Sequence, residues 1–208
     1  MARYTEAVCR LCRRSSEKLF LKGNKCFSEK CTLTKRAFPP GDHGQNRLKL
    51  SNYGTQMKEK QKVKWMYGMM EGQFRRYFQI ASHTKGVTGR VLLQLLERRL
   101  DNVIFRLGLA SSRPQARQVV RHNAVYVNSK RVNIPSYLVE QDDVIEIKVK
   151  EGFQKGIKDT LELNKNRSVP TWLDFDASSL KAKVNRLPEK NDIPATIQEQ
   201  LIVELYSK

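Results

Sequence analysis

Four cysteines within 23 consecutive positions are the residues of this 208-residue chain best suited to chemistry. They are Cys9, Cys12, Cys26 and Cys31, in the spacing C-x2-C-x13-C-x4-C, and the sequence has no other cysteine. Two closely spaced thiol pairs separated by a short loop are typical of a structural Zn2+ site with four thiolate ligands. Four thiolates fill the coordination sphere and leave no position for a reactive water. The spacing therefore predicts one structural zinc ion and no metal catalysis.

Disulfides and free thiols are the two other states open to these cysteines. Disulfides are typical of small exported domains. The chain instead runs from Met1 directly into charged sequence, without the apolar segment of a secretory signal. We therefore expect a reducing compartment, in which clustered thiols bind metal. A bound metal would stabilise a segment too short and too basic to build a hydrophobic core.

The charge of the chain indicates a polyanionic partner. The sequence has 39 Lys and Arg against 21 Asp and Glu, a formal net charge of +18 and a pI near 10.0. Residues 1–65 hold 16 of these cations against 5 acids, and the other 143 residues hold 23 against 16. This distribution is typical of nucleic-acid binding. A membrane-surface protein would need an amphipathic helix with a bulky apolar face or a lipidation signal, and neither is evident.

The N-terminal half is predicted to be a knob followed by helices. Residues 1–48 are expected to be an irregular zinc-binding knob and an extended basic arm, because two prolines and two glycines at 39–44 exclude regular structure. The arm should become ordered against a partner. Residues 49–97 are predicted to be the first part of a helical domain, with a lysine-rich helix at 53–66 and a second helix at 71–82 whose aromatic residues pack in a core.

The C-terminal half completes an α+β fold. Residues 98–163 are predicted to be a domain of two helices and a small antiparallel sheet. By its apolar period one long helix covers 91–107, and a second helix starts at Ser112 with a capping box. Strands begin at Val125, where the period changes to two. The segment 164–208 ends in apolar residues, which predicts that it packs back on the helical domain.

Three arginines of the second helix, Arg113, Arg117 and Arg121, recur at one-turn intervals. No acidic residue of the same helix stands beside them. Because guanidinium groups offer planar forks of donors, this line favours contacts with phosphate oxygens. The turn at 128–131 carries two further cations at its tip.

Five short motifs follow one another across the whole chain. They are RY and CRLCRR at 3–4 and 9–14, PPGDHG at 39–44, LERRLDNV at 96–103, ARQ and VYVN at 116–118 and 125–128, and LIVE at 201–204. In this order they resemble the family of bacterial small-subunit ribosomal protein S-four, in its zinc-binding four-cysteine form. The resemblance implies a helical domain built from both ends of the chain, with the family's RNA-binding fold inserted.

The resemblance also implies a function without catalysis. Members of the family bind the 5′ domain of 16S ribosomal RNA early in assembly. They lie near the mRNA entry channel beside protein S-five and influence decoding accuracy. The chain would accordingly act as a monomer within the small ribosomal subunit, in the cytoplasm, without membrane contact.

Two positions depart from the family pattern. Ser129 stands where glycine is common in the turn, and Asp142 replaces the glycine of a later Gly-Asp pair. If these positions need positive φ, serine is strained there, whereas aspartate tolerates it better. The turn at 128–131 is therefore expected to differ slightly in shape.

The residues expected to contact RNA lie in the knob, the arm, the lysine-rich helix, the arginine helix and the turn. They are Arg3, Arg10, Arg13, Arg14, Lys22, Lys35, Arg36, His43, Arg47, Lys49, Lys58, Lys62, Arg113, Arg117, Arg121, Asn128, Lys130 and Arg131.

Two other functions are less consistent with the sequence. An RNA-modifying enzyme would need a catalytic domain, for which the 58 residues after 150 are too few. A zinc-containing DNA-binding regulator would need a major-groove helix and two-fold symmetry, and no dimerising heptad is visible.

Overall fold

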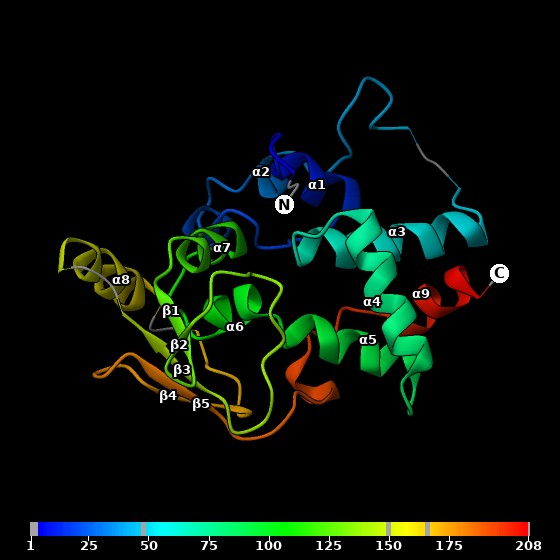
Figure 1. Cartoon of the computed structure of the whole chain (residues 1–208). Helices are drawn as coiled ribbons and strands as arrows, with labels where there is room; N and C mark the ends of the chain where they lie inside the picture. Colours follow the sequence, from blue (N-terminus) through cyan, green and yellow to red (C-terminus); the bar gives the residue numbers. More distant parts are fainter. Residues whose placement is uncertain (1–3, 47–48, 149–150, 165–166, 208) are drawn as a thin grey trace. The chain divides into compact units, whose positions relative to one another are not determined.

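A computed structural model describes the chain at residues 4–46, 49–148, 151–164 and 167–207 (Figure 1). The chain divides into two compact units. The first comprises Met1–Leu92 and Ala195–Lys208, and the second comprises Leu93–Pro194. The first unit is therefore completed by the C-terminal segment, and the second is inserted in it.

In the described residues of the first unit, every regular element is a helix. Its elements are α1 (Cys9–Ser15), the 3-10 helix η1 (Gly23–Cys26), α2 (Thr32–Lys35), α3 (Asn52–Met66), α4 (Glu71–His83), the start of α5 (Thr88–Glu97) and α9 (Glu199–Tyr206). The expectation of an irregular knob is thus wrong for α1, which has seven residues. Cys12 and Ser15 lie three positions apart, share a buried face and give α1 an interior side.

The long helix α3 begins at a polar cap. The Ser51 hydroxyl accepts a hydrogen bond from the Gly54 amide at 3.1 Å, which satisfies one of the open donors of the first turn. Gly68, with φ +63°, follows the C-cap residue. A positive φ is unstrained only for glycine, so this residue suits the point where the chain turns towards α4.

The buried face of α3 is largely polar and meets the C-terminal segment. Gln56 donates to a carboxylate oxygen of Glu204 on α9 at 2.8 Å, and the Gln198 amide donates to Glu59 at 2.9 Å. The two helices therefore pack through paired polar groups as well as apolar contacts.

On α4 the predicted core spacing of aromatic residues is confirmed. Phe74 and Ala81 are fully buried and Tyr77 is 6% exposed. Phe78 stacks on Tyr206 of α9 with ring centroids 4.5 Å apart. These side chains therefore serve packing and are not available to bind bases.

The second unit combines helices with one sheet. Its elements after α5 are α6 (Leu100–Arg106), α7 (Arg113–Arg121), β1 (Val125–Val127), β2 (Lys130–Arg131), β3 (Val144–Ile147), α8 (Glu151–Leu163), β4 (Leu173–Asp176), β5 (Lys181–Val184) and the 3-10 helix η2 (Lys190–Asp192). The strand order is β2-β1-β3-β5-β4, and every neighbouring pair is antiparallel. Val125, Ile145 and Val184 are buried on the sheet's inner face, together with the fully buried Trp172.

The single helix predicted over 91–107 is broken in two. Arg99 has an extended backbone (ψ 133°) and forms a bridge with Leu138. The amide of Leu100 donates to the Tyr137 carbonyl at 2.8 Å, and that of Val139 donates to the Arg98 carbonyl at 3.0 Å. The apolar period runs through the break because α5 and α6 both bury their apolar residues, so periodicity alone cannot detect it.

The predicted boundary at residue 164 also differs from the structure. β4 and β5 extend the sheet of the second unit, and only the segment from Ala195 belongs to the first unit. The sequence feature that identifies β5 as a strand is its alternation: Ala182 and Val184 are buried, and Lys181 and Lys183 are exposed. This period of two is typical of a half-buried strand.

Candidate nucleic-acid interface

The four cysteines lie on the short helices of the knob, residues 9–31. Cys9 and Cys12 belong to α1, Cys26 ends η1 and Cys31 precedes α2. All four are free thiols, and all but Cys9 are buried. Burial raises the pKa of the Cys12 and Cys26 thiols, and the other cysteines raise both further. The four sulfurs are therefore near enough to repel one another as thiolates.

Backbone donors point at these sulfurs. The Lys22 amide donates to the Cys26 sulfur at 3.3 Å. Burial opposes ionisation of Cys31, yet donation from the Leu33 and Thr34 amides outweighs it and lowers the pKa of its thiol. Such N–H donors suit metal-bound thiolates. As placed, however, no group of three or more His, Cys, Asp or Glu side chains within the described residues could hold a metal ion.

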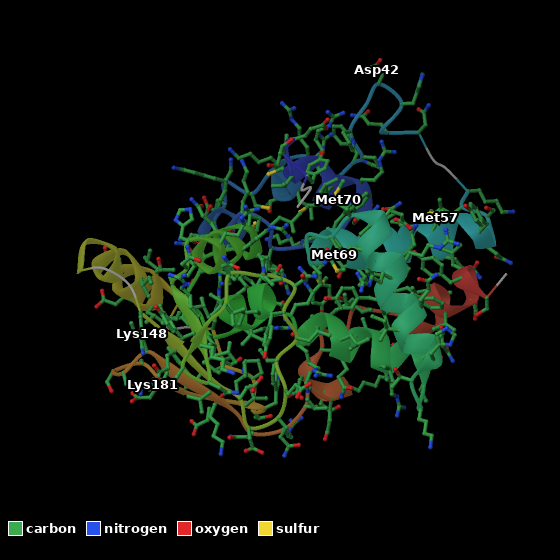
Figure 2. All side chains as sticks on the ribbon, viewed as in Figure 1. Asp42, Met57, Met69, Met70, Lys148 and Lys181 are labelled. Atoms are coloured by element: carbon green, nitrogen blue, oxygen red, sulfur yellow. The ribbon has the colours of Figure 1, made fainter. Side chains whose placement is uncertain are left out.

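Arg13, expected to contact RNA, instead binds the arm (residues 38–49). Its Nε donates to the Phe38 carbonyl at 2.9 Å and its Nη2 to the Pro39 carbonyl at 3.3 Å. Its guanidinium also lies 5.0 Å from the centroid of the Phe38 ring. Arg13 therefore fixes the start of the arm, whose outer turn carries Asp42 (Figure 2).

Most other predicted cations of the knob and the arm are exposed. They are Arg10, Arg14, Lys22, Lys35, Arg36 and Lys49, and His43 is exposed beside them. Arg3 and Arg47 lie outside the described residues. These exposed cations meet the first requirement for binding phosphate, which is access to solvent.

The lysine-rich face of α3 is mostly committed within the protein. Lys62 is buried, donates to the Thr196 carbonyl at 2.6 Å and pairs with Glu59 at 2.9 Å and Glu17 at 3.3 Å. This geometry contradicts the prediction that Lys62 contacts phosphate, because its ammonium already joins three segments of the first unit. Lys58, on the same helix, is half-buried.

The three arginines predicted to form one line on α7 have different surroundings. Arg113 is buried, donates to the Asn102 side-chain oxygen at 2.8 Å and lies 4.5 Å from the Phe105 ring centroid. Arg117 approaches Asp101 at 4.0 Å, whereas Arg121 is exposed. The prediction that all three face RNA is wrong for Arg113.

The partners of these arginines come from α6, which a survey of one helix could not reveal. Glu97, at the end of α5, and Arg99, in the break before α6, are both fully buried. Glu97 accepts from Asn102 at 2.6 Å and from Arg106 at 2.6 Å, and Arg99 pairs with Asp101 at 2.6 Å. The LERRLDNV motif therefore forms a buried polar network that joins the end of α5 to α6. Its Asn102 and Asp101 also reach Arg113 and Arg117 on α7.

The capping box predicted at the start of α7 is absent among the described contacts. The Ser112 side chain makes no capping hydrogen bond. Gln115 instead accepts from the Ser111 amide at 2.8 Å and from the Ser111 hydroxyl at 2.6 Å. The polar pair is thus shifted by one residue.

The turn between β1 and β2 has two left-handed residues, Asn128 (φ 48°) and Ser129 (φ 65°). Two positive φ values in a two-residue loop are those of a type I′ hairpin, so the suspected strain at Ser129 is present. The side-chain Nδ2 of Asn128 donates to Asp143 at 2.7 Å, and its side-chain oxygen accepts from the Val144 backbone amide at 2.9 Å. Asn128 is therefore occupied structurally, whereas Lys130 and Arg131 are exposed.

Cations on the sheet are partly neutralised. Lys181 and Lys148 approach the two oxygens of Glu146 at 2.8 and 3.2 Å, and Figure 2 shows the two lysines on the same side of the sheet. Their hydrogen bonds lower the pKa of the Glu146 carboxyl. One carboxylate neutralises one of the two lysines, so the cluster keeps a formal charge of about +1 at the surface.

Sequence reasoning missed exposed cations in the first unit. Arg75 and Arg76 project from α4 opposite its buried aromatic face, and Lys85 and Arg90 follow nearby in the chain. The helical period that predicted the packed face also implies this cationic one, and could have identified it.

No helix in the described parts of the chain is long and apolar enough to cross a membrane.

The comparisons with known proteins agree with the division of the chain. Residues 3–97 match the family model described as "Ribosomal protein S4/S9 N-terminal domain", and residues 98–145 match the one described as "S4 domain". The second match begins next to the break between α5 and α6.

Similar proteins match over their whole length. The chain is 57% identical to the "Small ribosomal subunit protein uS4" of Thermodesulfovibrio yellowstonii over 209 residues. It is 55% identical to proteins of the same name from Dictyoglomus turgidum and Desulforapulum autotrophicum over 208 residues each. Each alignment covers 100% of both chains. The chain therefore belongs to the S4 family of small-subunit ribosomal proteins.

Proposed function

We propose that this protein is a structural constituent of the small ribosomal subunit and binds 16S ribosomal RNA directly. The observation that carries the proposal is full-length similarity, above 50% identity, to proteins named as small ribosomal subunit proteins. The net charge of +18 suits a polyanionic partner. The role is structural and not enzymatic, and it is exercised where ribosomes act, in the cytoplasm.

Affinity and selection would come from different features. The exposed cations of the knob, the arm and the β1–β2 turn neutralise phosphates and supply most of the affinity. Side chains cannot read the deep major groove of A-form RNA, so selection depends on the shape of a folded junction. We assign the 5′ domain of 16S RNA as the target, with protein S-five and the mRNA entry region as neighbours and an influence on decoding accuracy.

We further propose that Cys9, Cys12, Cys26 and Cys31 hold one structural Zn2+ as thiolates. The support is the spacing of four free thiols, three of them buried, with backbone N–H groups donating to the Cys26 and Cys31 sulfurs. A bound Zn2+ would cross-link α1, η1 and α2 and would add to the few buried apolar residues of the knob.

Zinc content and knob stability test this assignment. Purified protein should contain about one zinc per chain, as expected for one four-thiolate site. The double substitution Cys9→Ser with Cys12→Ser should release the zinc, expose residues 9–31 to protease and weaken RNA binding, while residues 93–194 stay folded. Substoichiometric zinc in the wild type, or unchanged protease resistance in the variant, would contradict it.

A competition titration at physiological salt tests RNA binding itself. Labelled 16S 5′-domain RNA is bound, and unlabelled 5′-domain RNA or a generic duplex RNA of equal length competes. We expect the duplex to compete orders of magnitude more weakly. Equal competition would leave only a basic nucleic-acid binder, such as a zinc-containing regulator.

A further inference from the structure

Two phenylalanine rings stack on each other at the surface of the knob. Phe20 lies between α1 and η1, and Phe27 directly follows η1. Their ring centroids are 5.0 Å apart, with 28° between the planes. Phe20 is 38% exposed and Phe27 60%, which makes Phe27 the most exposed aromatic side chain among the described residues. Large apolar side chains exposed as a pair suggest an interaction site.

The backbone holds this pair outward at a cost. Phe20 has φ +52°, a left-handed conformation that is an outlier for a bulky residue. Its neighbours Leu19 and Leu21 are both buried, at 1% and 8% exposure. The left-handed residue thus accompanies an arrangement in which both leucines point inward and the ring between them stays in solvent. A backbone outlier that leaves a large apolar ring in solvent suggests a role in binding.

The surroundings of the rings are cationic. Lys18 and Lys22 stand two residues on either side of Phe20, and Lys25 stands two residues before Phe27. All three lysines are exposed. A docking site for another protein would be expected to have an apolar core depleted of lysine. Aromatic faces interspersed with cations are instead typical of surfaces that bind single-stranded nucleic acid.

We propose that Phe20 and Phe27 form a stacking platform for one unpaired base of the RNA. This inference rests on the proposed function. Phe27, the more exposed ring, would stack on the base, and Phe20 would support it from behind. The neighbouring lysines would bind the adjoining phosphates. Because phenylalanine offers no hydrogen-bonding group, the contact distinguishes an unpaired base from a paired one and does not distinguish base types.

The platform would add a second source of selection to shape recognition. A continuous duplex offers no free base face within its length, so it can use the lysines but not the rings. A junction or loop with an extruded base can use both. The preference for folded RNA over duplex should therefore depend on Phe27.

The test compares Phe27→Leu, Phe27→Tyr and wild-type protein for binding of 16S 5′-domain RNA over a range of salt concentrations. Leucine keeps the apolar side chain and removes the ring, so Phe27→Leu should weaken binding by about 5- to 150-fold, as for loss of one stacked base. The slope of log affinity against log salt should not change, because stacking releases no counterions. Phe27→Tyr should retain wild-type affinity.

Lys22→Gln is the matched control from the same loop. It should reduce the salt slope by about one, as expected for a lost phosphate contact. Irradiation of the wild-type complex at short ultraviolet wavelength should cross-link RNA to the peptide that contains Phe27.

Two outcomes would overturn the inference. Equal affinity of wild type and Phe27→Leu would exclude the platform, and so would a loss in Phe27→Leu accompanied by a lower thermal midpoint and no cross-link in the wild type. In either case wild-type protein that still prefers the 5′ domain over duplex leaves the proposed function intact. Wild-type protein without that preference would instead contradict the proposed function.

Discussion

At the scale of single residues, Lys62 shows that a cation of a basic protein can be fully engaged in contacts within the fold. Its ammonium is 2.6 Å from the Thr196 carbonyl and pairs with Glu59 and Glu17. Those groups come from the C-terminal segment, from α3 itself and from the chain after α1. An RNA phosphate could bind Lys62 only if these contacts broke.

We predict that Lys62→Met destabilises the protein and that Lys58→Met does not. Removing one partner of a buried ion pair leaves the other charge uncompensated, at a cost of about 3 kcal/mol. Lys58 is half-buried, and its substitution should change stability by less than about 0.5 kcal/mol. Urea unfolding of both variants measures these effects. Equal stability of the two variants would mean that the Lys62 contacts contribute nothing.

The turn at Ser129 allows a stabilising substitution. Ser129 has φ 65°, which costs a residue with a Cβ about 1 kcal/mol relative to glycine. Ser129→Gly should therefore raise the free energy of unfolding by about that amount. Asn128→Gly should lower it, because the Asn128 side chain bonds Asp143 and Val144. A stabilised Asn128→Gly variant would contradict the structural role of that amide.

At the scale of secondary-structure elements, α7 has two different faces. Arg113 and Arg117 turn towards Asn102 and Asp101 of α6, whereas Arg121 is exposed. The three arginines that recur every four residues along α7 therefore have different roles. One end of the helix is held by the fold, and the other end is open to a phosphate.

Substitution of each arginine by alanine should separate these roles. Arg113→Ala removes a buried charge-assisted hydrogen bond and should lower stability by about 1.5–3 kcal/mol. Arg121→Ala should leave stability unchanged within about 0.5 kcal/mol and reduce the salt slope of RNA binding by about one. Thermal unfolding and salt-dependent titration measure the two. A large stability loss in Arg121→Ala would show that it too is structural.

One carboxylate of α4 contributes to the docking of α9. Glu71 accepts from Lys60 at 2.6 Å, from Lys64 at 3.0 Å and from the Tyr206 hydroxyl at 3.0 Å. Partial burial opposes ionisation, but these hydrogen bonds outweigh it and lower the pKa of Glu71 from 4.5 to about 2. Burial and the neighbouring Glu71 raise the pKa of Tyr206.

Acid should therefore weaken this contact. A carboxyl whose pKa is lowered in the folded state stabilises that state fully at pH values above its pKa in the unfolded chain. The stabilisation is lost as the pH falls through its pKa in the folded state. The window runs from about pH 4.5 to about pH 2. Since Glu71 is half exposed, the contribution is at most about 1 kcal/mol. The gap in urea stability between wild type and Glu71→Gln should close across this window, and a constant gap would contradict the assignment.

At the scale of the whole molecule, patterns local to one segment were the predictable part. The aromatic face of α4, the hairpin after Val125 and the strain at Ser129 all follow from short-range spacing. The break between α5 and α6 could not be detected, because the residues that pair with Arg99 lie near Leu138. Long-range pairing of this kind leaves no trace in a local period.

The candidate site was predictable in kind but not in detail. Net charge and the cysteine spacing indicate a nucleic-acid binder with a clustered thiol site. Which cations remain exposed depends on partners distant in sequence, as Lys62 with Thr196 and Arg13 with Phe38 demonstrate. The stacked rings of Phe20 and Phe27 are also a tertiary feature, because they are seven residues apart and on opposite sides of η1.

Reconstitution of the small subunit tests the central claim most directly. Purified protein is added to 16S RNA and the other small-subunit proteins, with the resident S4 left out, and the particles are separated by sedimentation. We predict particles that sediment as complete small subunits and contain this chain in a one-to-one ratio with 16S RNA. Particles that lack the chain, and sediment as they do when S4 is omitted, would contradict the account.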